Sequence, residues 1–222
     1  MERIVDLHAA FMERLITEGS ILQELERHGI KILPGFLEQI ELVRSYYKKF
    51  YTAPTRRIVF CGINPKHYGG RKTGIPFVDF IGVERLMPGC SNERRDQERS
   101  AQFMLSIMEA YEPGTFQDTV YLTNLSWYGF LRNGRTLNFY NLPASVRHHF
   151  IDSFTEEMKI VQPVCIVPLS QEIARTLRLL QDGGHLDYPI ADRLPHPMQC
   201  SFPSNRKRSR ERYFDVYGTL EM

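Results

Sequence analysis

Residues 57–65 read Arg-Ile-Val-Phe-Cys-Gly-Ile-Asn-Pro. The apolar run predicts a buried strand over 57–63, and the amide of Asn64 followed by a proline marks its end. Far downstream, residues 194–197 read Leu-Pro-His-Pro and place His196 between two prolines at another expected strand end. In an open α/β fold, ligands bind outside the carboxyl ends of the strands. We therefore expect Asn64 and His196 to meet at one edge of a sheet.

Strand-like apolar runs alternate with segments of helical periodicity along the rest of the chain. Further strands are expected at 118–125, at 164–169 and, as a short fourth strand, near 188–194. Helical spacing of apolar residues covers 1–28, 36–50, 101–111, 146–161, 173–180 and a basic segment from about 205. This alternation predicts the α/β class, as a three-layer α/β/α fold with a central, mostly parallel four-stranded sheet. We expect a single domain over residues 1–222, with 1–50 as a helical extension packed on its core.

The composition is that of an ordinary globular protein, with 42% hydrophobic and 24% charged residues and a formal net charge of +2. The chain has no run of about 18 apolar residues and no apolar signal core near its start. We therefore expect an intracellular protein without a membrane span, cytoplasmic or, in a eukaryote, nuclear. The cysteines form no CxxC pair, so no metal site is predicted, and we expect free thiols at Cys61, Cys90, Cys165 and Cys200.

Residues 64–94 form a long segment rich in glycine, proline and charge, a length at which loops of compact domains are usually functional or disordered. From Asn64 to Phe77 it reads Asn-Pro-Lys-His-Tyr-Gly-Gly-Arg-Lys-Thr-Gly-Ile-Pro-Phe. This stretch resembles the first motif of the uracil-DNA glycosylase superfamily, most closely that of its single-strand-selective monofunctional (SMUG-type) branch. Three later blocks resemble further motifs of the branch in the same order: 121–125, 134–137 with 142–144, and 194–197. The resemblance spans roughly residues 56–216, and 1–50 contribute nothing to it.

The resemblance implies a monomeric, monofunctional DNA glycosylase that removes uracil from DNA, begins base excision repair and needs no cofactor. Asn64 would hold the attacking water by hydrogen bonds, because an amide takes up no proton near neutral pH. His196 would donate a hydrogen bond to the base oxygen on which negative charge develops. Phe77 would stack on the flipped base and Asn124 would read its edge. The remaining substrate-binding positions are expected to be Gly62, Ile63, Pro65 and Lys66.

A simpler interpretation also exists for each of the proposed catalytic and base-contacting side chains, Asn64, His196, Phe77 and Asn124, when it is taken alone. Asn64 is a common turn former before proline, and His196 fits a capped loop histidine. Phe77 fits a core aromatic residue and Asn124 a strand-end cap.

The expected DNA contacts lie in the first-motif loop and after the second motif. They comprise His67, Gly69, Gly70, Met198, Gln199, Ser204, Asn205, Arg206 and Arg208. In the second motif and after it, the chain departs from the usual His-Pro-Ser-Pro-Arg of the family. The wedge residue, which fills the gap that the flipped base leaves in the duplex, would be Met198, Gln199 or Phe202. Basic residues crowd positions 206–212, a pattern typical of phosphate binding or of a solvated helix face.

Lys66 stands where the branch commonly has glycine, beside the 5-carbon of the pyrimidine. It would narrow the pocket or extend to a phosphate. The range of bases therefore stays open and includes 5-hydroxymethyluracil, xanthine and hypoxanthine, as does the choice between single- and double-stranded DNA. A Schiff base on Lys66 would make the enzyme bifunctional, but the branch uses water.

Two rival functions remain. A non-catalytic nucleic-acid-binding domain derived from this superfamily would explain Lys66 and the altered second motif. A serine esterase would require the nucleophile elbow G-x-S-x-G, whereas residues 168–172 read Pro-Leu-Ser-Gln-Glu. We therefore interpret Ser170 as the N-cap of a helix.

Overall fold

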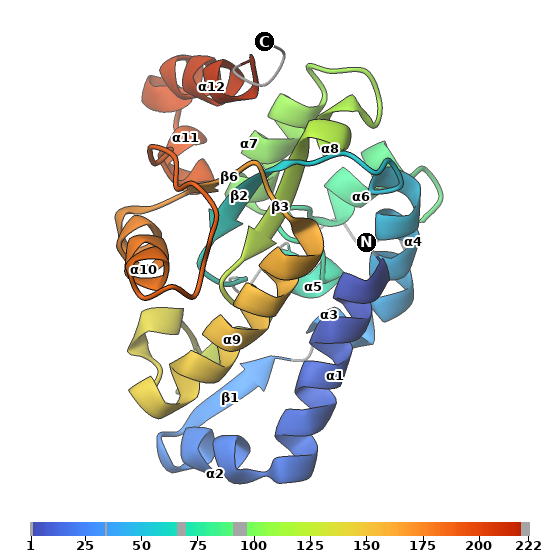
Figure 1. Ribbon diagram of the computed structural model, residues 1–222. Coiled ribbons are helices and arrows are strands. Elements are labelled where there is room, and N and C mark those ends of the chain that lie inside the picture. Colours follow the sequence, from blue (N-terminus) through green and yellow to red (C-terminus); the bar gives the residue numbers. More distant parts are fainter. Residues whose placement is uncertain (1, 34, 66–69, 91–96, 219–222) are drawn as a thin grey trace.

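A computed structural model of the chain describes residues 2–33, 35–65, 70–90 and 97–218 (Figure 1). A parallel sheet lies at the centre, with the order β3-β2-β6. Its strands are β2 (Ile58–Gly62), β3 (Val120–Asn124) and β6 (Cys165–Pro168). Every residue of β2 and β3 is buried, as expected for parallel strands covered on both faces. The three longer predicted strands are confirmed.

The predicted fourth strand near 188–194 is wrong, because the parallel sheet has three strands within the described residues. A single isolated bridge, between Ile190 and Ile166, joins that segment to β6. The carbonyl of Pro189 does accept the Ile166 N–H at 2.9 Å. Proline has no amide hydrogen of its own, however, and so it cannot continue a ladder.

A second, antiparallel sheet is not predicted by the sequence analysis. Its order is β1-β4-β5, formed by β1 (Ile30–Leu33), β4 (Gly129–Arg132) and β5 (Arg135–Leu137). β1 lies inside the first 50 residues, which we expected to be helical. The β4–β5 hairpin turns through Asn133 and Gly134, whose φ angles are 53° and 72°. Such positive angles are those that an Asn-Gly hairpin turn requires.

Helices flank the parallel sheet and complete the three-layer α/β/α arrangement (Figure 1). The amino-terminal helices are α1 (Glu2–Glu18), α2 (Ser20–Arg27), α3 (Gly35–Glu38) and α4 (Ile40–Phe50). The later ones are α5 (Gly70–Thr73), α6 (Phe80–Leu86), α7 (Arg99–Met108), α8 (Thr115–Thr119), α9 (Ala144–Val161), α10 (Gln171–Asp182), α11 (Pro197–Cys200) and α12 (Pro203–Gly218), with a 3₁₀ turn at Phe139–Asn141. The helix expected over 1–28 is interrupted at Gly19, where φ is 70°. α1 packs against both α4 and α9.

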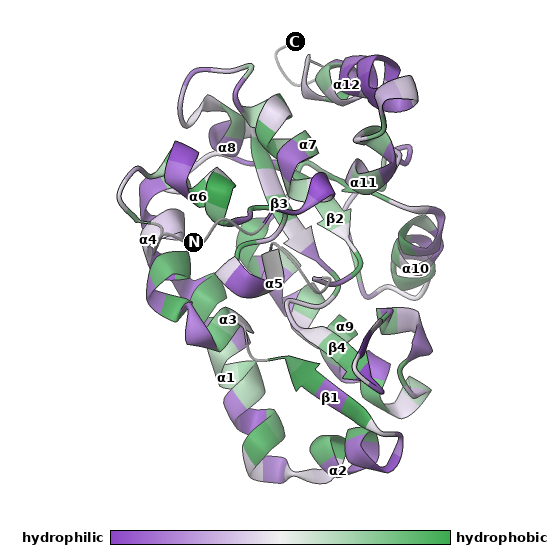
Figure 2. Cartoon of the chain, turned by 180° about the vertical axis from the view of Figure 1, so that it is seen from behind, coloured by the Kyte–Doolittle hydropathy of each residue, from purple (hydrophilic) through white to green (hydrophobic). Residues whose placement is uncertain are grey.

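One continuous apolar cluster runs from Ile4 in α1 to Tyr217 in α12, so the first 50 residues share their core with the central sheet. Figure 2 shows β1 as largely hydrophobic and α12 as largely hydrophilic. All four cysteines lie in the described ranges and are free, which confirms that prediction. None of the described helices is both long enough and apolar enough to cross a bilayer.

Candidate functional site

A cavity of about 290 Å³ lies at the carboxyl ends of β2 and β3. Asn64, from the loop after β2, and His196, from the loop before α11, both line its wall. The cavity therefore brings together the two proline-flanked side chains that the sequence analysis expected to meet. The complete lining within the described residues is Ile63, Asn64, Pro65, Pro76, Phe77, Glu98, Ser100, Asn124, Thr136, Leu137, Asn138 and His196.

The amide of Asn64 is fixed by backbone groups on both of its ends. The Phe139 N–H donates to Oδ1 at 3.0 Å. Nδ2 donates to the carbonyl oxygens of Leu137 at 3.4 Å and Pro65 at 3.2 Å. Exchanging oxygen and nitrogen would place like against like at all three contacts, so the orientation of the amide is determined. The second lone pair of Oδ1 can still accept a hydrogen bond from a water molecule.

His196 is held in one tautomer by the helix that it caps. Its Nδ1 accepts the N–H of Met198 at 3.1 Å, and Pro197 takes the first position of α11. An accepting Nδ1 carries no proton, so a neutral ring carries its proton on Nε2. Upstream, Leu194 N–H donates to the carbonyl of Pro168 at the end of β6, 3.0 Å away. The result is a hydrogen-bond donor placed at the sheet edge by the loop itself.

Phe77 and Asn124 approach each other across Gly62, the last residue of β2. An ideal Cβ at position 62 would lie 2.5 Å from Cζ of Phe77 and would also collide with Oδ1 of Asn124. Only glycine fits between these two side chains. Phe77 itself has a φ of 59°, a left-handed conformation that bulky residues rarely adopt. Strain of this kind is often found at functional sites.

The turn that holds Phe77 is closed by the buried hydroxyl of Thr73. Its Oγ1 donates to the Val78 carbonyl at 2.6 Å and accepts the Ile75 N–H at 3.1 Å. Gly74, with a φ of 75°, packs so closely on α4 that an ideal Cβ would lie 2.8 Å from Val43. The motif Thr-Gly-Ile-Pro-Phe is thus a compact turn pressed against the amino-terminal helices.

Asn124 ends β3 and pairs in register with Gly62. The residue is 5% exposed, and within the described ranges its side chain makes no hydrogen bond. Both its carbonyl oxygen and its NH₂ group are therefore available to whatever occupies the cavity.

Two cavity residues at the start of α7, Glu98 and Ser100, were missed by the sequence analysis. The Ser100 hydroxyl donates to Oε1 of Glu98 at 2.7 Å. The fully buried Asp79 fixes their position, because its carboxylate accepts the N–H of Glu98 at 3.0 Å, the N–H of Gly82 at 2.8 Å and Nε2 of Gln102 at 2.8 Å. Asp79 is readable as the N-cap of α6, whereas Glu98 gives no signal in the sequence.

Five of the predicted DNA-contacting residues of α11 and α12 lie around two separate hollows. Four of them line one of about 330 Å³, together with Arg212: Gln199, Ser204, Asn205 and Arg208. Arg206 lines the other, of about 420 Å³, beside Lys207 and Arg210. The structure therefore does not bring Arg206 together with Arg208.

The wedge candidates Met198 and Phe202 are exposed hydrophobic side chains close to His196 in sequence. The guanidinium of Arg99 lies 5.4 Å from the centre of the Phe202 ring. Met198 is the second residue of α11.

Several predicted positions lie elsewhere. Lys66, His67 and Gly69 are outside the described residues, and Gly70 is the first residue of α5. Ser170 does cap α10, since its Oγ accepts the Ile173 N–H at 3.3 Å. Within the described part of the chain, one group of possible metal ligands occurs, on α9, and none of its members lines the cavity: His148, His149 and Asp152.

The chain matches both a known protein family and solved structures. A sequence profile of the uracil DNA glycosylase superfamily matches residues 49–217. Among solved structures, the chain is similar to wild-type SMUG2 of Pedobacter heparinus, with a TM-score of 0.76, 20% sequence identity, and coverage of 87% of this chain and 89% of that chain. At this identity the structural likeness shows a shared fold. No curated protein gives a significant match.

Proposed function

The chain belongs to the uracil-DNA glycosylase superfamily, and from that membership we propose that it is a monofunctional DNA glycosylase. It hydrolyses the N-glycosidic bond of uracil in DNA and thereby begins base excision repair. One observation supports this above all: the amide of Asn64 and the imidazole of His196 line a single cavity beside Phe77 and Asn124.

Recognition begins when the target base leaves the DNA stack, at a cost of a few kcal/mol. The ring of Phe77 forms one wall for the flipped base, and stacking of this kind is worth about 1–3 kcal/mol. Asn124 pairs with the pyrimidine edge, its oxygen accepting from N3–H and its NH₂ donating to O4. Because no described residue already uses that amide, a base can satisfy both of its ends.

Hydrolysis then requires a placed water and a stabilised leaving group. Asn64 Oδ1 accepts a hydrogen bond from the water, and this bond directs the oxygen of the water molecule at the anomeric carbon. As the bond between that carbon and the base nitrogen breaks, the electron pair moves into the base. His196 donates from Nε2 to the base oxygen on which the charge collects, a contact worth about 3 kcal/mol. Water supplies the new hydroxyl of the sugar and loses its proton to solvent, so no lysine adduct forms.

The DNA backbone binds on the basic helix α12 and on α11, which precedes it. Gln199, Asn205 and Arg208 surround a hollow that a phosphate can enter. Each phosphate that such residues neutralise makes the affinity for DNA more dependent on salt. The protein acts as a monomer on this partner.

The experiment is uracil release from an oligonucleotide, detected as strand cleavage after alkali. Asn64→Ala and His196→Ala should each lower the rate by orders of magnitude, since each removes a preorganised group. Ser170→Ala is the matched control, because that hydroxyl caps α10 and does not line the cavity. Wild-type rates in both cavity variants would refute the assignment.

Two further assays address the finer points. Borohydride gives no covalent adduct with a monofunctional enzyme. An oligonucleotide set with uracil, 5-hydroxymethyluracil, xanthine and hypoxanthine defines the range of bases. The rival, a non-catalytic binding domain, requires salt-sensitive binding without an abasic product from any of the four.

A further inference from the structure

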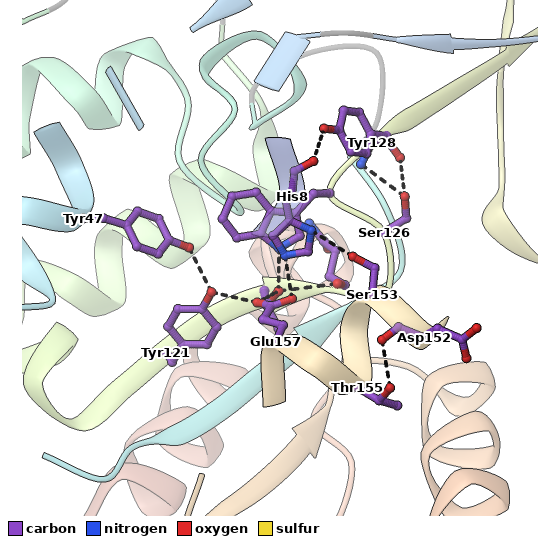
Figure 3. A network of polar contacts seen from close by, with 12 residues as sticks. His8, Tyr47, Tyr121, Ser126, Tyr128, Asp152, Ser153, Thr155 and Glu157 are labelled. Carbon is purple, nitrogen blue, oxygen red and sulfur yellow. Dashed lines mark hydrogen bonds and ion pairs between the residues drawn. The ribbon is translucent and has the colours of Figure 1, made fainter. Parts of the chain in front are cut away.

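A buried polar network lies beside β3, on residues that the proposed mechanism does not use (Figure 3). Its centre is Glu157 of α9, which has no exposed surface. Carboxylate oxygen Oε1 accepts hydrogen bonds from Tyr121 Oη and Thr123 Oγ1, both at 2.7 Å. Oxygen Oε2 lies 3.1 Å from Nε2 of His8 in α1. The carboxylate therefore joins the amino-terminal helix to two positions of β3.

The hydroxyl protons of this network have defined directions. Burial, and after it the charge of Glu157, raise the pKa of Tyr121 well above its ordinary value, so the phenol keeps its proton and donates a hydrogen bond to Glu157. Tyr47 is then the donor in the 3.0 Å contact between the two phenols. Trp127 donates to Thr123 Oγ1 at 3.1 Å and stacks on the His8 ring at 4.1 Å.

The network lies on the opposite side of β3 from the cavity. Successive residues of a strand face opposite sides, so Tyr121 and Thr123 face Glu157 while Asn124 faces the cavity. The Asn124 side chain has no hydrogen bond of its own within the described ranges. Its position therefore depends on the backbone of β3, which the Thr123–Glu157 contact holds from behind.

Two partners in this network, His8 and Tyr47, precede residue 49, where the superfamily profile begins. A buried carboxylate needs partners, because leaving one unpaired is strongly destabilising. His8 thus docks α1 at a defined place against α9 and β3.

We infer that His8 is a positioning residue of the base-recognition site. Through Glu157 and Thr123 it holds β3 in the position at which Asn124 meets the edge of the base. The inference rests on the proposed function, since it assigns to the amino-terminal helix a share in reading the base.

The test compares the full-length wild type with His8→Ala, His8→Gln and Val5→Ala at a temperature where circular dichroism shows each to be folded. One readout is kcat/KM for uracil release. The other is Kd for a strand with a tetrahydrofuran abasic analogue, which offers no base to Asn124. We expect His8→Ala to lower kcat/KM by about ten- to a hundredfold, the loss caused by a misplacement near 1 Å, and to leave Kd unchanged. Glutamine can donate from a similar position, so His8→Gln should recover most of the rate.

Val5 is the matched control, since it is fully buried in the same helix and has no polar group. Val5→Ala should keep the wild-type kcat/KM. Equal losses in Val5→Ala and His8→Ala, or a wild-type rate in His8→Ala, would overturn the inference.

If His8→Ala does not fold, Thr123→Val provides the test instead, because valine keeps the shape of the threonine side chain and removes its hydroxyl group. A lower kcat/KM with unchanged Kd supports the inference, and a wild-type kcat/KM overturns it. A wild type that releases no uracil overturns the proposed function and this inference with it, whereas an active wild type with an unaffected His8→Ala overturns the inference alone.

Discussion

Gly62→Ala adds one methyl group at the point where Phe77 and Asn124 meet. The new Cβ would lie 2.5 Å from Cζ and 3.0 Å from Cε2 of Phe77. Carbon atoms pack best at about 3.5–4.0 Å, so the ring must retreat by about 1 Å. Phe77 already has a strained φ of 59°, which leaves its backbone little freedom to relax. Overpacking of this size costs about 1–3 kcal/mol of unfolding free energy, and a displacement near 1 Å costs about a hundredfold in kcat/KM.

Urea unfolding measures the first quantity, and single-turnover release of uracil from an oligonucleotide measures the second. Gly218→Ala is the control, because a Cβ there meets no atom within 4 Å. If Gly62→Ala matches the wild type in both stability and rate, the close approach of the two side chains across Gly62 is not real.

Three other predictions concern stability and DNA binding. Asp79→Ala leaves three N–H groups without their acceptor and should lower the unfolding free energy by at least about 2 kcal/mol in urea titrations, while Asp79→Asn should lose less. Burial raises the pKa of Tyr46 to about 12. The phenol therefore ionises in the unfolded chain before it ionises in the folded chain, and the unfolding free energy should fall by up to about 1.4 kcal/mol per pH unit between pH of about 10 and about 12. In urea titrations at pH 9 to 11, the unfolding free energy of Tyr46→Phe should fall less steeply with pH than that of the wild type. An equal slope for the two proteins would contradict the raised pKa of Tyr46. Arg208→Gln should weaken DNA binding and reduce the slope of log K against log salt by about 1, as measured by fluorescence anisotropy, and an unchanged slope would remove Arg208 from the phosphate contacts.

The central sheet and the two ends of the cavity could be predicted because their signals are local. Residues 58–62 are apolar throughout, as parallel strands covered on both faces must be. The proline after Asn64 follows the end of β2, and carboxyl ends of parallel strands share one edge. His196 does lie at that edge as expected, although a loop bonded to the end of β6, and not a fourth strand, brings it there. That reasoning needs no knowledge of the residues between them.

The errors concern features that depend on distant partners. The strand Ile30–Leu33 exists because it pairs with residues about a hundred positions later, and four residues alone give no periodicity. The pair Asn133-Gly134 is typical of a hairpin turn. Because this stretch was interpreted by its resemblance to a family motif, the sequence analysis does not predict the β4–β5 hairpin. Pro189 argued against a regular fourth strand. Glu98 is held at the cavity by a hydrogen bond from its backbone N–H to the Asp79 carboxylate, and no sequence pattern predicts this contact.

The backbone cradle around Asn64 has an evolutionary consequence. The groups that orient this amide are the main-chain N–H of Phe139 and the main-chain carbonyls of Leu137 and Pro65. None of them depends on the identity of a side chain. A substitution at one of these three sites that preserves the path of the main chain therefore leaves the direction of the amide unchanged.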